Sequence, residues 1–78
     1  MNRQQIKVVV LSVLSAVLKC EVDDEGSREN LAQWDSLKHI EVIFAIEDEL
    51  NFQFPEEMLP DLNSVESIVD AAERLYEA

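Results

Sequence analysis

The sequence is poor in the residues that make tight turns, because its 78 residues include one glycine and two prolines. That supply is too small for the many turns of an all-β fold. The chain also has a single cysteine, Cys20, so no disulfide can form within it. A lone thiol is typical of a reducing compartment. These absences favour a helical protein without disulfides.

No hydrophobic run in the sequence is long enough to span a membrane, and we expect no signal peptide. Residues 8–18 are rich in apolar side chains, but two serines interrupt them and Lys7 and Lys19 bracket them. The expected location is therefore the cytoplasm. The length allows one small domain over residues 1–78, and the apolar content of 47% is too high for a disordered acidic tail.

Basic residues are also scarce, since 6 Lys and Arg face 17 Asp and Glu, for a net charge of −11. Residues 1–20 carry three bases and no acid, a charge of +3. Residues 21–78 carry the other three bases and all 17 acids, a charge of −14. Such a body repels nucleic-acid phosphates and anionic membranes and attracts basic protein surfaces. We expect neither nucleic acid nor membrane as a partner.

Apolar residues recur at helical spacing over residues 6–18, which predicts a first helix. Asn2 and Gln5 before this run have the spacing of a capping box. The period is then lost over residues 20–34, which we interpret as one long loop. A loop of this length is uncommon in a compact domain and is usually functional. Three of its apolar residues are expected to hold it to the core: Val22, Leu31 and Trp34.

A second helix is predicted from Asp35 or Ser36, both good residue types for an N-cap, to about Leu50. Asn51 suits the left-handed conformation that commonly ends a helix. The apolar residues of this helix form a broad face: Leu37, Ile40, Ile43, Phe44, Ile46 and Leu50.

A short helix of one or two turns is predicted over residues 56–59, ending before Pro60. The last helix is predicted to follow Asn63 or Ser64, and Asn63 and Glu66 have capping-box spacing. The predicted fold class is therefore all-α. It is a small four-helix bundle with three main helices, a short third helix, and a long loop between helices one and two.

Two arrangements resemble metal or catalytic sites but fail on inspection. The acidic stretch around Gly26 resembles a calcium-binding EF-hand loop, but Ala32 occupies the position that needs a bidentate Glu. One Cys and one His cannot supply a zinc site. Ser36, His39 and Asp35 lie close together, but a chain with one glycine has little means to build a walled active site. We interpret His39 as a solvated helix residue, and expect neither metal nor catalysis.

The helix start at Asp35-Ser36-Leu37 is unusual because it places a hydroxyl at a helix amino end, which favours a bound phosphate. Taken alone it is a weak signal, since the simpler interpretation makes Asp35 and Ser36 caps and Leu37 a core residue. This motif, with Phe-Gln-Phe-Pro at 52–55 and the segment 62–69, resembles the acyl and peptidyl carrier proteins. The resemblance implies that Ser36 bears 4′-phosphopantetheine, attached from coenzyme A by a phosphopantetheinyl transferase. The arm would carry acyl, aminoacyl or polyketide groups as thioesters in fatty-acid or specialised-metabolite synthesis.

The same resemblance makes the second helix a recognition helix for loading, condensing and modifying enzymes with basic docking surfaces. Trp34 before the motif favours a discrete carrier of a specialised pathway, and a monomer is the plain expectation. The alternative is an acidic helical interaction module that has no prosthetic group. Besides Asp35, the residues expected to contact partners are Leu37, Ile40, Glu41, Phe44, Glu47 and Asp48.

Overall fold

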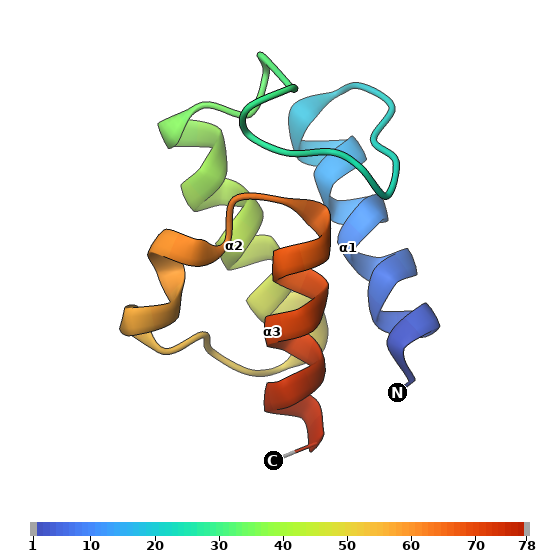
Figure 1. Ribbon diagram of the computed structural model, residues 1–78, viewed down its shortest axis with the longest axis vertical. Coiled ribbons are helices and arrows are strands. Elements are labelled where there is room, and N and C mark those ends of the chain that lie inside the picture. Colours follow the sequence, from blue (N-terminus) through green and yellow to red (C-terminus); the bar gives the residue numbers. More distant parts are fainter. Residues whose placement is uncertain (1, 78) are drawn as a thin grey trace.

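The computed structural model describes residues 2–77, which fold into four helices (Figure 1). Their bounds are α1, Arg3–Leu18; α2, Ser36–Leu50; the short 3-10 helix η1, Glu56–Asp61; and α3, Val65–Glu77. Helices α2 and α3 run opposite to α1, and η1 lies beside α2. The prediction of a small all-α bundle with a long first loop is confirmed.

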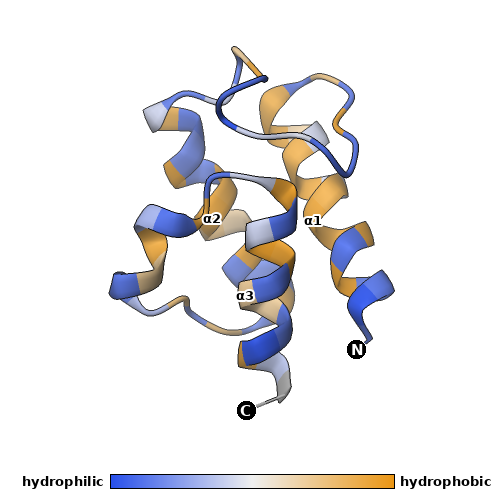
Figure 2. Ribbon diagram, viewed as in Figure 1, coloured by the Kyte–Doolittle hydropathy of each residue, from blue (hydrophilic) through white to orange (hydrophobic). Residues whose placement is uncertain are grey.

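Helix α1 packs against both α2 and α3, and its apolar face supplies the centre of the core. Figure 2 shows α1 as largely hydrophobic beyond its first turn, whereas α3 alternates between hydrophobic and hydrophilic stretches. Burying one such side chain contributes about 1.5–3 kcal/mol, so this core is the main source of stability. No helix within residues 2–77 has the length and apolar content needed to cross a membrane. The largest fully buried side chains are Trp34, Ile6, Leu14, Ile46, Leu62 and Ile68.

The ends of α1 and α2 form as their sequences predict. Asn2 and Gln5 make a reciprocal capping box, in which each side chain accepts a hydrogen bond from the other residue's amide at 2.9 Å. Asn51 ends α2 in the left-handed region with φ of 58°. Lys19 ends α1 in the same way, with φ of 56°, although lysine is a less usual residue there.

Two details of the second half differ from the predictions. The short helix continues through Pro60 to Asp61 instead of ending before the proline. Proline removes a single amide donor, and the bond from the Leu62 amide to the Leu59 carbonyl, at 3.2 Å, still closes the segment. Helix α3 follows Ser64, one of the two predicted residues, but the reciprocal capping bonds join Ser64 and Ser67 and not Asn63 and Glu66.

The first loop, residues 20–34, is anchored at several points. Trp34 is buried, and Val22 and Leu31 pack half-buried against the core, as predicted. Ser27 forms an isolated antiparallel bridge with Ser64, which joins the middle of the loop to the start of α3. These contacts place the loop beside the amino ends of both α2 and α3, where Figure 1 shows it crossing.

Candidate functional site at the start of α2

Ser36 is the first residue of α2 and is exposed, but it does not cap its own helix. Asp35 is the N-cap, and its Oδ1 accepts a hydrogen bond from the Lys38 amide at 2.9 Å. The Asp35 carbonyl accepts another from the His39 amide at 2.8 Å. Because Asp35 takes over the cap, the Ser36 hydroxyl remains available at the positive end of the helix.

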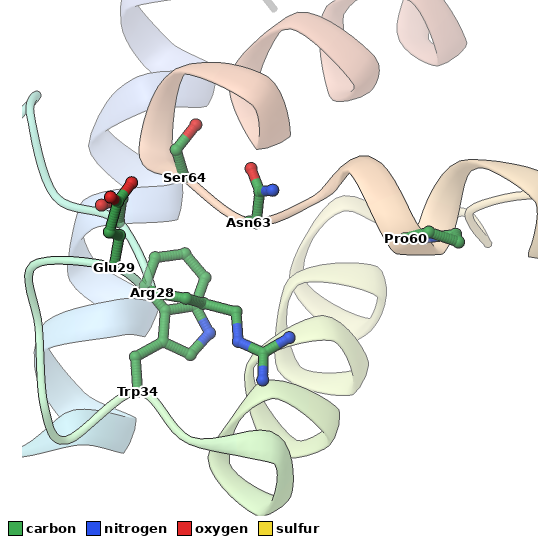
Figure 3. A pocket seen from close by; sticks show the side chains of 7 residues that line it. Arg28, Glu29, Trp34, Pro60, Asn63 and Ser64 are labelled. Atoms are coloured by element: carbon green, nitrogen blue, oxygen red, sulfur yellow. The ribbon is translucent and has the colours of Figure 1, made fainter.

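The side chain that reaches the Ser36 hydroxyl is Arg28, from the first loop. Its Nη2 donates a hydrogen bond to Ser36 Oγ at 3.3 Å. The Arg28 backbone amide also donates to the Asn63 carbonyl at 2.9 Å, which fixes this part of the loop against the segment before α3. Figure 3 shows the guanidinium extending away from Glu29 and Ser64 toward α2. A cationic group therefore stands directly over the hydroxyl.

Trp34 and His39 form a second pair beside the site. Trp34 Nε1 donates a hydrogen bond to His39 Nδ1 at 3.0 Å, and the ring centroids lie 5.9 Å apart. The expectation of a solvated His39 is wrong, since the ring is half-buried against the indole. Burial lowers the pKa of His39 below 6.5, and the nearby charge of Arg28 lowers it further, while the Leu59 backbone acts weakly in the opposite direction. A neutral imidazole with Nδ1 as acceptor matches this hydrogen bond.

Two hollows meet at Arg28 and Pro60, which line both of them. A polar hollow of about 550 Å³ lies between the first loop and the start of α3, with Trp34 in its wall (Figure 3). An apolar hollow of about 480 Å³ lies between α2 and η1. It is lined by Arg28, His39, Ile40, Ile43, Phe44, Leu59 and Pro60. Arg28, which contacts Ser36, thus adjoins space of two different polarities.

The outer face of α2 exposes three large apolar side chains: Leu37 is 76% exposed, Ile40 54% and Phe44 65%. These are the three apolar residues expected to contact partners. The core side of α2 is filled by Ile43, Ile46, Leu50 and Val42, the last of which was not predicted. Large apolar groups gathered on one exposed helix face are typical of an interaction surface.

The three acids predicted for this face differ in their surroundings. Glu41 lies within ion-pair distance of Lys38, with 3.4 Å between Oε2 and Nζ. Glu47 is half-buried, and its Oε2 accepts a hydrogen bond from the Phe54 amide at 2.7 Å, so it also holds the chain after α2. Asp48 is exposed. Glu47 lies next to the core side of the helix because it follows Ile43 by one turn.

The acidic part of the first loop is occupied by local contacts. The Asp23 side chain accepts a hydrogen bond from the Glu25 amide at 3.0 Å, and Asp24 pairs with Lys7 at 3.1 Å. Over residues 2–77, no three His, Cys, Asp or Glu side chains gather as a metal would require. These contacts hold the acidic part of the loop against itself and against α1.

Arg28 is the site residue that the sequence patterns did not identify. It lies eight positions before Ser36 in a segment without periodicity, so no spacing rule connects the two. The available signal was its charge, since Arg28 is the one base between Lys19 and Lys38 in an acidic stretch. By contrast, Asp35, Ser36 and Leu37 were placed correctly at the start of a helix.

The surroundings of Ser36 fit a phosphodiester. The hydroxyl is exposed, the helix end is positive, and a guanidinium already contacts the oxygen that would be esterified. A family profile described as the phosphopantetheine attachment site matches residues 8–72, which span most of the chain and include Ser36. The chain therefore belongs to the phosphopantetheine-attachment family, whose members carry covalently attached 4′-phosphopantetheine.

Proposed function

We propose that Ser36 is the attachment residue and that the chain carries thioester-bound intermediates between biosynthetic enzymes. The observation that supports this most directly is the exposed Ser36 hydroxyl at the amino end of α2, relieved of capping by Asp35. When bound, the prosthetic group supplies a thiol that holds the cargo. The chain itself supplies the attachment oxygen and a surface for partners.

The other five serines are less suited to attachment. Ser12 and Ser15 lie within α1, away from any helix amino end. Ser27 Oγ accepts a hydrogen bond from the Asn30 amide at 3.3 Å, and Ser64 and Ser67 bond to each other. Ser36 alone among the six combines exposure with a helix start and a cationic neighbour.

Intact mass spectrometry tests the attachment. The apo protein is incubated with coenzyme A and a promiscuous phosphopantetheinyl transferase, beside a control carrier. We expect the wild type to gain one phosphopantetheine and Ser36→Ala to gain none. Ser12→Ala, which removes another exposed hydroxyl, should be modified as the wild type is. An unmodified wild type, in a reaction that modifies the control carrier, would instead support an acidic interaction module without a prosthetic group.

The partner surface in this proposal is the outer face of α2, which we call the docking face: Leu37, Ile40, Glu41, Phe44, Glu47 and Asp48. Its exposed apolar groups would be covered on contact, and its acids would steer it toward basic enzyme surfaces. The chain needs no catalytic group for this role. His39 does not act as a base on Ser36, because its Nδ1 accepts the Trp34 hydrogen bond.

The transferase reaction also tests the docking face. Truncating a central interface residue typically costs more than 1 kcal/mol, so Phe44→Ala should lower kcat/KM for arm transfer by about fivefold or more. Val8→Ala is the matched control, since Val8 is an exposed apolar residue (53%) on α1, outside this face. If both variants lower kcat/KM equally, the docking face is not where the transferase binds.

A further inference from the structure

We infer that Arg28 binds the phosphodiester that joins Ser36 to its prosthetic group, and that docking of the first loop onto α3 sets the position of this guanidinium. The inference rests on the proposed attachment to Ser36. Arg28 Nη2 already lies 3.3 Å from Ser36 Oγ, the oxygen that would bear the phosphorus. The unesterified phosphate oxygens would lie two bonds beyond Ser36 Oγ, on the same phosphorus, within reach of the same guanidinium.

The charge of Arg28 is not neutralised within the described chain. Arg3 pairs with Asp70 and Glu73, and Lys7 and Lys38 also have carboxylate partners. For Arg28, none of the side chains described over residues 2–76 offers a carboxylate within ion-pair distance, and Figure 3 shows the neighbouring Glu29 turned away from the guanidinium. A planar guanidinium with several donors is well suited to phosphate oxygens.

Backbone contacts fix the segment that bears Arg28. Its own amide bonds to the Asn63 carbonyl, and the Val65 amide bonds to the Gly26 carbonyl, both at 2.9 Å. Gly26 is buried, and a Cβ there would lie 2.8 Å from Val22 Cγ1, too close for any other residue without a shift. The single glycine of the chain thus allows the loop packing that holds Arg28 over Ser36.

The position of Arg28 also decides where the arm begins. Arg28 lines both the polar hollow of about 550 Å³ and the apolar hollow of about 480 Å³. A phosphodiester held by this side chain places the base of the arm at the boundary between the two hollows. Arg28 is therefore a positioning residue, which orients the arm and takes no part in its chemistry.

The test is ³¹P NMR of the phosphopantetheinylated protein, compared with Arg28→Gln, Arg28→Lys and Arg74→Gln. Arg74 is an exposed arginine in the last turn of α3, so its replacement removes the same charge elsewhere. We expect the phosphodiester resonance to move in Arg28→Gln, to move less in Arg28→Lys, and to stay in place in Arg74→Gln. Added salt should move the wild-type resonance toward that of Arg28→Gln, because exposed charges are screened.

Equal ³¹P shifts in Arg28→Gln and Arg74→Gln, or a wild-type shift unaffected by salt, would overturn the inference. Intact mass is measured first on every sample, so failure to modify Ser36 is recognised separately as failure of the proposed function. Arg28 is exposed, so the apo variants should unfold nearly as the wild type does. Attachment should also raise Tm more in the wild type than in Arg28→Gln.

Discussion

Ser36 and Ser64 both stand at the amino end of a helix, but their hydroxyls have opposite surroundings. Ser64 is half-buried, its Oγ accepts the Ser67 amide at 3.1 Å, and the two hydroxyl oxygens lie 3.0 Å apart. Ser36 is exposed and leaves the capping hydrogen bond to Asp35. The Ser64 hydroxyl caps α3 and so stabilises the fold. The Ser36 hydroxyl caps nothing and remains available for modification, because Asp35 caps α2.

The two helix starts are physically connected through the first loop. Ser27 bridges to Ser64, and the next residue, Arg28, reaches Ser36. Ser64 lines the polar hollow beside Arg28, whereas Ser36 contacts Arg28 without lining that hollow. The two hydroxyls also differ in their hydrogen bonds within the described part of the chain, because Ser64 Oγ caps α3 and Ser36 Oγ accepts only from the Arg28 side chain.

The largest expected effect is the loss of stability in Trp34→Ala, which removes the buried indole directly before Asp35. Truncating a large core aromatic residue costs about 3–5 kcal/mol, much of the stability of a small domain. Urea unfolding measures the loss, and hydrogen exchange should show faster opening in the first turn of α2 than in that of α3. Trp34→Phe keeps most of the volume and should cost much less. If the two helix starts open equally, Trp34 does not selectively anchor the Ser36 side.

The next largest effect is expected for Gly26→Ala, which should lower the free energy of unfolding by about 1–3 kcal/mol because the new Cβ overpacks against Val22 and Leu31. This change weakens the link between the two helix starts, because the Gly26 carbonyl accepts the Val65 amide. Glu29→Ala, an exposed position in the same loop, is the matched control and should stay within about 0.5 kcal/mol of the wild type in urea unfolding. Equal costs for the two variants would contradict tight packing at Gly26.

The pair Ser64→Ala and Ser36→Ala tests the comparison directly. Losing a capping hydroxyl costs typically about 1 kcal/mol, so Ser64→Ala should lower the free energy of unfolding by that amount. Ser36→Ala should change it by less than about 0.5 kcal/mol, since its hydroxyl caps nothing. Asp35→Ala should resemble Ser64→Ala, and urea unfolding of the apo proteins measures all three. A large cost for Ser36→Ala would mean that its hydroxyl contributes to the fold.

The sequence predicts the helices well because helix formation depends on neighbouring residues. The 3.6-residue period and the cap types locate α1 and α2 closely, and they place Ser36 at a helix start. The sequence left the start of α3 open between Asn63 and Ser64, because both are good cap residues. The choice between them depends on Ser67, a hydroxyl partner that the capping-box pattern of Glu or Gln does not include.

The contacts around Ser36 were harder to predict because they depend on how the first loop folds. Nothing within the loop sequence indicates that Ser27 meets Ser64, and without that bridge Arg28 has no defined direction. The interpretation of His39 failed for the same reason. Its polarity suggested solvent, but a buried Trp34 five residues earlier turns its indole N–H toward the imidazole. Local patterns located the helix start, whereas tertiary contacts determined its surroundings.

The smallest expected effect is a pH dependence of the stability. It arises near Ser36, because His39 is the one histidine of the chain and lies on that side and not near Ser64. The pKa of His39 is lowered in the folded protein, chiefly by burial and then by Arg28. As the pH falls through about 6.5, the unfolded chain takes up a proton that the folded chain does not, so stability decreases. The decrease ends below the lowered folded pKa, where both states are protonated.

His39→Gln should remove this part of the pH dependence and keep an acceptor for the Trp34 N–H. The measurement is urea unfolding of wild type and variant between pH 7.5 and the mildly acidic range, above the pH at which exposed carboxylates titrate, about 4. Arg28→Gln offers the converse change, because removing its charge should raise the pKa of His39 toward its ordinary value, as followed by NMR titration. If the pKa of His39 does not change in Arg28→Gln, the guanidinium does not lie close to the imidazole. That result would contradict the position of Arg28 beside Ser36 at the start of α2.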